Sequence, residues 1–182
     1  MRWAVVYATG EGQTERIAAA IAERLRAAGH SVTLHALQRR RGGGAAASPV
    51  LDGVDRVVVA GSIHLGRFAR RLVRWCRARA AALSARRAVL VVVSLTAAGD
   101  EAREWAGLTR IVERFAARTA WNPAAVHHVA GRLAFSRYGP LTRRVMRRIA
   151  RGHGLDTRGD ADVELTDWTA VRWLADELAA AG

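Results

Sequence analysis

The N-terminal segment constrains the fold most, because it reads as a strand, a tight polar loop and a helix in direct succession. Residues 3–8 are apolar, residues 9–14 form a loop with two glycines, and residues 15–28 follow with a helical pattern. Where a strand passes into a helix through such a loop, the free N–H groups and the positive dipole end of the helix converge, which suits a phosphate. Thr9 and Thr14 add hydroxyl donors, and the glycines allow close approach of an anion. We therefore expect a phosphate-bearing cofactor here.

Spacing separates three nucleotide-binding loops that such a segment could form. A P-loop requires a lysine before its Ser/Thr, and the chain contains no lysine. The dinucleotide fingerprint requires a third glycine where Glu15 stands. The remaining type is a hydroxyl-rich loop that resembles the one in flavodoxins, which Thr9, Gly12 and Thr14 fit. Glu11 takes a position where flavodoxins often carry another hydroxyl, so its carboxylate should point to solvent or hold a backbone N–H. An ordinary strand-to-helix turn without a ligand is the alternative.

Strand and helix patterns alternate along the rest of the chain, which predicts a doubly wound α/β sheet. Two further strands are apolar at consecutive positions, as in parallel strands covered on both faces. The predicted strands after the first are residues 30–37, 56–62, 88–94 and 125–131, and the later helices are residues 68–83, 101–119 and 167–180. We predict a flavodoxin-like, five-stranded parallel sheet of order 2-1-3-4-5 with helices on both faces. Residues 1–182 are expected to form a single domain, with a surface loop at residues 38–49.

Composition limits the classes of function that the chain can have. The single cysteine, Cys76, excludes an internal disulfide and a CxxC site, so redox chemistry would need a bound cofactor. No apolar stretch is long enough to span a membrane and the start of the chain lacks a signal-peptide layout, so we expect a cytoplasmic protein. The net charge of +13 would suit nucleic acid or an anionic membrane. Because all 29 of the Lys and Arg residues are arginine, we expect part of this excess to reflect coding bias.

Polar residues follow three of the predicted strands, where doubly wound sheets bind their ligands. The first strand ends in the loop already described. The third ends in Ser62, Ile63, His64, Leu65 and Gly66, and the fourth in Ser94, Leu95 and Thr96. We expect the first loop to hold the phosphate of one planar cofactor and the other two to flank its ring. His64 could donate a hydrogen bond to that ring or lie on the surface as an ordinary loop histidine.

Motifs spread over nearly the whole chain resemble those of one family. They are Gly12-Gln13-Thr14, Gly61-Ser62-Ile63 with Gly66, Ala130-Gly131-Arg132-Leu133, Tyr138, Asp156-Thr157-Arg158 and Thr166-Asp167-Trp168. On these residues the chain resembles the bacterial flavodoxin-like, menaquinone-dependent protoporphyrinogen IX dehydrogenases (oxidases). The later motifs discriminate best, because ordinary flavodoxins share only the first loop.

The resemblance implies an FMN enzyme of haem biosynthesis that oxidises protoporphyrinogen IX to protoporphyrin IX and passes electrons to a quinone. It implies that the FMN phosphate is held by Thr9, Gly10, Glu11, Gly12, Gln13 and Thr14, and that the ring lies between residues 62–66 and residues 94–96. Leu65 departs from the family, which tends to carry an aromatic residue there, so stacking on the flavin would be weaker. No catalytic side chain is implied, and the residue pattern predicts no metal site.

An insertion at about residues 133–160 exceeds what a minimal doubly wound domain needs. Within it, residues 141–151 (Leu141 to Arg151) pattern as a basic amphipathic helix, which suits either an anionic membrane surface or an anionic ligand. An arginine-rich solvated helix on the sheet edge is the alternative. Arg132, Arg137 and Arg158 could hold the propionates of a tetrapyrrole by paired N–H bonds.

Three other functions remain open from the sequence. A flavodoxin-like electron carrier would also bind FMN, although such carriers are typically acidic. An FMN-dependent quinone reductase would oxidise a nicotinamide cofactor instead of a tetrapyrrole. An arginine-rich nucleic-acid-binding module would need no flavin, and it is the least favoured.

Overall fold

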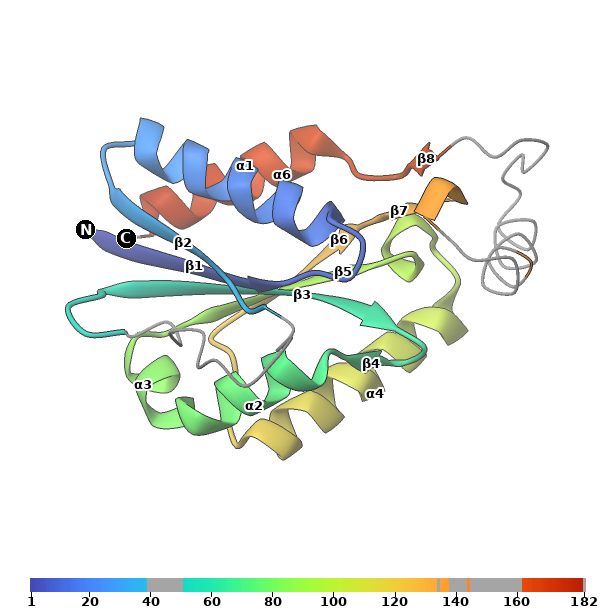
Figure 1. Ribbon diagram of the computed structural model, residues 1–182, viewed down its shortest axis with the longest axis horizontal. Helices are drawn as coiled ribbons and strands as arrows, with labels where there is room; N and C mark the ends of the chain where they lie inside the picture. Colours follow the sequence, from blue (N-terminus) through green and yellow to red (C-terminus); the bar gives the residue numbers. More distant parts are fainter. Residues whose placement is uncertain (39–50, 134, 138–143, 145–161, 182) are drawn as a thin grey trace.

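A five-stranded parallel sheet forms the centre of the molecule (Figure 1). The structure, a computed structural model, describes residues 1–38, 51–133, 135–137, 144 and 162–181. The five strands are β1 (Arg2–Ala8), β2 (Ser31–Ala36), β3 (Arg56–His64), β5 (Val89–Ser94) and β6 (Val126–Ala130). They pair in the order β2-β1-β3-β5-β6, and all four pairings are parallel. The predicted sheet and its strand order are confirmed.

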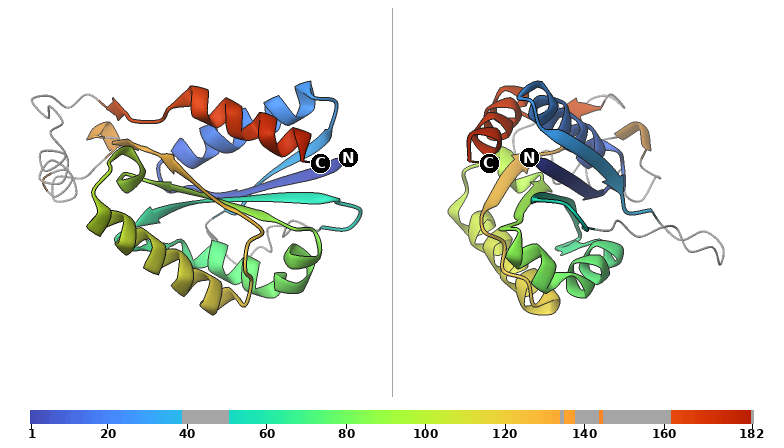
Figure 2. Two further views of the ribbon diagram at one scale, coloured as in Figure 1. Left: turned by 180° about the vertical axis from the view of Figure 1, so that it is seen from behind. Right: turned by 90° about the vertical axis from the view of Figure 1, so that its left-hand side faces the viewer.

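Helices cover both faces of the sheet (Figures 1 and 2). One face carries α1 (Gln13–Ala27) and α6 (Trp168–Ala180), and the other carries α2 (Arg70–Ala78), α3 (Ala80–Ala85) and α4 (Ala102–Thr119). Two cores result, because alternate residues of the central strands point to opposite faces: Val57 and Val59 enter the α2/α4 core, and Val58 enters the α1/α6 core. The predicted stripe of α1, which includes Ile17 and Ile21, is fully buried. Each such side chain contributes about 1.5–3 kcal/mol of burial free energy.

Short strands that the sequence did not predict lie at the carboxyl edge of the sheet. β4 (Arg67–Phe68) folds back on the end of β3 as an antiparallel hairpin, and β7 (Arg132–Leu133) pairs with β8 (Val163–Glu164). Between β3 and β4 only Leu65 and Gly66 make the turn, with φ of 49° and 70°. Positive φ at both residues is the signature of the mirror-image turns that join tight hairpins.

The single helix predicted for residues 68–83 is wrong, because the structure divides this segment. Phe68 belongs to β4, and the helix is interrupted at Arg79, which has φ −128°. Arg79 lies on the same stripe as the buried Leu72 and Cys76, so a continuous helix would drive a guanidinium toward the core, which is costly. The break lets Arg79 stand over the Trp75 ring, 5.2 Å from its centroid.

Two predicted segments fall largely outside the described residues. They are the surface loop at residues 38–49 and the inserted basic helix at residues 141–151, of which only Arg144 is described, exposed and helical. The single-domain assignment remains a prediction. In the described part of the chain, no helix has the length and apolar character needed to cross a bilayer.

Candidate functional site

The loop between β1 and α1 presents an open helix N-terminus. Gly12 stands at the N-cap of α1 with φ 96°, and no side chain caps the helix. The Gly12 N–H donates to Thr9 Oγ1 at 2.8 Å, which closes the loop. The guanidinium of Arg71, from α2, donates to the Thr9 carbonyl. The first amides of α1, its positive dipole end and a nearby cation therefore lie together, an arrangement that suits an anion.

Gly10 brings this first loop against the β3–β4 hairpin. A Cβ atom built on Gly10 would lie 3.2 Å from His64 Nε2, so the imidazole packs directly over the glycine. Any side chain at Gly10 would fill the space between the two loops. The first and second predicted loops are thus brought together, as expected.

The second loop is a strained, exposed hairpin tip. Leu65 adopts a left-handed conformation that bulky residues rarely take, and it is 88% exposed. Strain and apolar exposure at one residue are typical of positions kept for binding rather than for stability.

The third loop lies beside the other two at the carboxyl edge of the sheet, on the right in Figure 1. Ser94 is buried and its Oγ accepts from the Ala97 N–H at 3.3 Å, at the start of the short 3₁₀ helix η1 (Thr96–Ala98). The Ser94 carbonyl accepts from the Gly131 N–H at 3.1 Å, which joins this loop to the end of β6. Leu95 packs against the small buried cluster of Leu133 and Phe135.

The side chain of Gln13 is used for structure. It is 6% exposed, and its Nε2 donates to Glu164 Oε1 and to Thr166 Oγ1, each at 2.7 Å. Its Oε1 accepts from Arg16 Nη1 at 3.0 Å, and Arg16 also pairs with Glu164 at 2.8 Å. The Thr166 hydroxyl in turn donates to the Ala130 carbonyl at 2.7 Å. This polar cluster fastens the start of α1 to β8 and β6, and only the backbone N–H of Gln13 remains for a ligand.

Sequence reasoning missed this cluster, although one signal for it was present. Thr166, Asp167 and Trp168 belong to the C-terminal motif on which the resemblance rests. In the structure Thr166 joins the cluster, Asp167 caps α6, and the Trp168 ring lies 4.9 Å below the Arg16 guanidinium.

Two side chains near the loop are less open to a ligand than their types suggested. Thr14 is 1% exposed, which places its hydroxyl inside the protein. Tyr7 is buried and donates to Glu15 Oε1 at 2.7 Å. Burial, helped by that carboxylate, raises the pKa of Tyr7 to about 12, so the phenol stays neutral at physiological pH.

The three arginines expected to hold substrate are described by the structure to different extents. Arg132 is paired with Asp162, with Nη1 and Oδ2 3.4 Å apart, and its side chain is 21% exposed. Only the backbone of Arg137 is described, in η2 (Phe135–Arg137), and Arg158 lies outside the described residues, as do Tyr138 and Asp156.

Three further titratable side chains, those of Cys76, His127 and His128, are fully or partly buried. Cys76 is fully buried, and burial raises the pKa of its thiol to about 12. His127 and His128 face opposite sides of β6, and burial lowers the pKa of both imidazoles. Among the described residues, no group of three His, Cys, Asp or Glu side chains could hold a metal ion.

Comparison with known proteins places this chain in a family. The model of the flavodoxin domain family matches residues 4–160. The chain belongs to this flavodoxin family. Membership identifies FMN as the cofactor, which confirms the expectation from the sequence. An archaeal flavodoxin of known structure shares the fold, with a TM-score of 0.52, 12% identity and coverage of 100% of this chain and 98% of its own.

Two curated relatives confirm the narrower resemblance. A Leishmania major protein is 28% identical over 97% of this chain and 74% of its own length. One from Escherichia coli strain K12 is 26% identical over 98% of this chain and 95% of its own length. Both are named protoporphyrinogen IX dehydrogenase (quinone).

Proposed function

We propose that this flavodoxin-family chain is an FMN-dependent dehydrogenase of haem biosynthesis. It oxidises protoporphyrinogen IX to protoporphyrin IX and passes the electrons to a quinone, with menaquinone as the expected acceptor. The observation that carries the proposal is the match, over nearly the whole chain, to relatives named for this reaction. An open helix N-terminus and three loops at one sheet edge support it, because they provide a place for a phosphate and a planar ring.

The FMN phosphate would be held by the first loop. The first backbone amides of α1, from Gln13 onward, have no side-chain cap, and the space above Gly10 is closed on one side by His64. The nearby Arg71 cation stabilises an anion at this point. Residues Thr9, Gly10, Glu11, Gly12, Gln13 and Thr14 form this part of the site.

The ring would lie between the second and third loops. These are Ser62, Ile63, His64, Leu65 and Gly66 on one side and Ser94, Leu95 and Thr96 on the other. When bound, FMN supplies an electron acceptor for hydride removal that no side chain can provide. The residues of the chain position the reactants and exclude water, and no side chain is assigned as an acid or base. Arg132, Arg137 and Arg158 would hold substrate propionates.

The protein is proposed to act in the cytoplasm, touching the cytoplasmic face of an anionic membrane through residues 141–151. Replacing the arginines of that segment, Arg143, Arg144, Arg147 and Arg148, by Gln should abolish binding to anionic liposomes. Unchanged binding would contradict the membrane contact.

The first test is FMN binding followed by an anaerobic assay. Gly10→Ala should weaken FMN binding by about tenfold, or about 1.4 kcal/mol, because its Cβ enters the space beside His64. Gly107→Ala is the matched control, because a Cβ at Gly107 meets nothing within 4 Å. The FMN-loaded protein should then convert protoporphyrinogen to fluorescent protoporphyrin with stoichiometric reduction of a quinone. A protein that reduces quinone with a nicotinamide cofactor but leaves protoporphyrinogen unchanged would be a quinone reductase instead.

A further inference from the structure

The imidazole of His64 reaches from the second loop of the site to the first. The three heavy atoms nearest to a Cβ atom built on Gly10 all belong to its ring: Nε2 at 3.2 Å, Cδ2 at 3.7 Å and Cε1 at 3.9 Å. Nε2 is the closest of them, so the nitrogen edge of the ring faces the first loop. In the imidazolium and in the Nε2–H tautomer this nitrogen is a hydrogen-bond donor.

The alternation of side chains along β3 explains this direction. Val59 and Ile63 pack in or against the α2/α4 core, and Ala60 lies in the α1/α6 core. His64 follows Ile63, so it is directed to the side of the sheet on which α1 begins. Ile63 is paired with Phe68, which is buried in the α2/α4 core, and this pairing fixes the register of the hairpin. The position of the imidazole therefore follows from the packing of the core.

The loop that the imidazole faces is the one expected to hold a phosphate. The Gly12 N–H donates to Thr9 Oγ1 at 2.8 Å, so the loop folds back on itself and Gly10 lies beside the uncapped start of α1. No hydrogen bond or ion pair joins the His64 side chain to another residue that the structure describes. A phosphate in this loop would have the helix N–H groups on one side and an unengaged imidazole nitrogen on the other.

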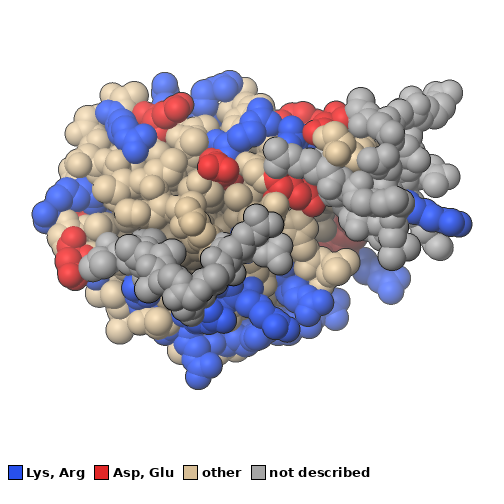
Figure 3. Space-filling view, viewed as in Figure 1, with Lys and Arg blue, Asp and Glu red and all other residues tan. Residues whose placement is uncertain are grey.

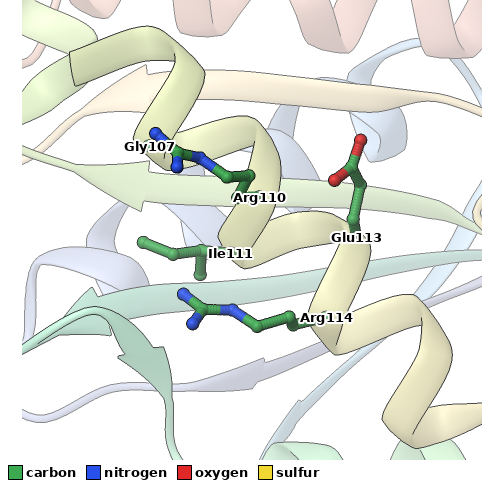
Figure 4. Close-up of a pocket in the computed structure, with 5 residues that line it drawn as sticks. All are labelled: Gly107, Arg110, Ile111, Glu113 and Arg114. Atoms are coloured by element: carbon green, nitrogen blue, oxygen red, sulfur yellow. The ribbon is translucent and has the colours of Figure 1, made fainter. Parts of the chain in front are cut away.

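The positive charge of the surface is gathered elsewhere. Basic side chains lie along the lower side of the molecule in Figure 3, over α2 and α4, and Figure 4 shows Arg110 and Arg114 of α4 among them. These helices cover the face of the sheet opposite to α1. The Arg71 guanidinium reaches the loop from α2, where it donates to the Thr9 carbonyl. Because Glu11 adds a negative charge to the loop itself, a further donor facing the loop favours a phosphate.

We propose that His64 binds the phosphate of FMN through its Nε2–H group. The imidazole thereby makes the site selective for FMN over riboflavin, which has the same ring system and no phosphate. This inference rests on the FMN site of the proposed function and refines it: the side chain of His64 belongs to the phosphate, while Leu65 and Gly66 at the hairpin tip stay beside the ring. A bond from an imidazole N–H to a phosphate oxygen is charge-assisted and therefore stronger than one between neutral groups.

Titrations of the flavin-free protein with FMN and with riboflavin, followed by flavin fluorescence, test this assignment. His64→Phe keeps an aromatic ring over Gly10 and removes the donor. It should bind FMN about tenfold more weakly, the effect of one hydrogen bond to a charged group, and riboflavin as the wild type does. His64→Gln retains an N–H donor and should recover much of the FMN affinity. The matched control is Arg110→Gln, which removes a charge from an exposed position of α4 and should bind both flavins as the wild type does.

Two results of these titrations would overturn the inference. Equal loss of FMN and riboflavin affinity in His64→Phe would place the imidazole beside the ring, and unchanged FMN affinity would leave it without a ligand. Phosphorus NMR of the FMN-loaded protein gives a second measurement: the resonance of the bound phosphate should shift in His64→Phe and not in Arg110→Gln, and an unshifted resonance in both also contradicts the assignment.

Failure of the proposed function is distinguishable from failure of this inference, because neither measurement involves the substrate. A protein that binds the FMN phosphate through His64 and leaves protoporphyrinogen unoxidised would keep the phosphate contact and lose the proposed reaction.

Discussion

Replacing Gln13 by Met should destabilise the protein by about 2 kcal/mol. Methionine keeps the length and volume of the side chain, so the change removes polar contacts without opening a cavity. Three hydrogen bonds of Gln13 are lost, to Glu164, Thr166 and Arg16. Each is worth about 0.5–1.5 kcal/mol net. Three such bonds together span roughly 1.5–4.5 kcal/mol. The expected loss of about 2 kcal/mol falls in the lower half of that span, because Thr166 keeps its bond to the Ala130 carbonyl and Glu164 keeps its pair with Arg16.

Urea unfolding followed by circular dichroism measures this loss, with an unchanged m-value as the sign that the folded state is intact. In a chain of this size the melting temperature should fall by about 4–8 °C. Thr166→Val should lower the free energy of unfolding by about 1 kcal/mol or more. The double variant should lose at least 0.5 kcal/mol less than the sum of the single losses, because both residues share one bond. Strict additivity would refute the idea that this cluster fastens the start of α1 to the C-terminal part of the fold.

Three further changes have defined outcomes. Leu65→Asn should raise the free energy of unfolding by about 0.5–1 kcal/mol in urea titrations, because asparagine tolerates the left-handed conformation that leucine resists; Leu65→Ala, which keeps most of the strain, should change it little. Asp167→Ala should cost about 1 kcal/mol in the same assay, because the carboxylate accepts from the Thr169 and Ala170 N–H groups, and Asp167→Ser should recover much of that loss. Burial lowers the pKa of His127 and His128 below the ordinary 6.5, so the unfolded chain takes up protons first and the free energy of unfolding should fall as the pH drops through about 6.5. His128→Gln should flatten that pH dependence; an unaltered slope would assign it to other groups.

The sequence predicts best those elements whose apolar pattern follows directly from burial in the central sheet or against it. Consecutive apolar positions in β3 and β5 mark strands buried on both faces, and the spacing of Ile17, Ile21 and Leu25 marks the inner side of α1. The left-handed backbone at Gly12, the N-cap of α1, is a conformation that glycine adopts at little cost, and the loop carries a glycine there. The positions of the three candidate loops could therefore be predicted, since parallel strands all end at one edge.

Features that depend on distant partners could not be predicted. The β3–β4 hairpin contains a strand of two residues, too short to show a period. The interruption at Arg79 arises because a guanidinium on the buried stripe has no place in the core. Gln13 and Thr166 are separated by 153 positions in the sequence, and nothing local to either residue indicates the bond.

The β7–β8 ribbon makes the fold tolerant of change in one defined place. Residues on either side of the insertion pair directly, Arg132 with Glu164 and Leu133 with Val163, and the Gln13 cluster secures the same point. Leu133 and Val163 are therefore held side by side at one fastened junction, from which the connection between them begins and to which it returns. Doubling a connection of this kind adds only about 0.6 kcal/mol of closure entropy. We therefore expect a longer connection between β7 and β8 to cost little folding stability, because the strand pairing already fixes where its two ends lie.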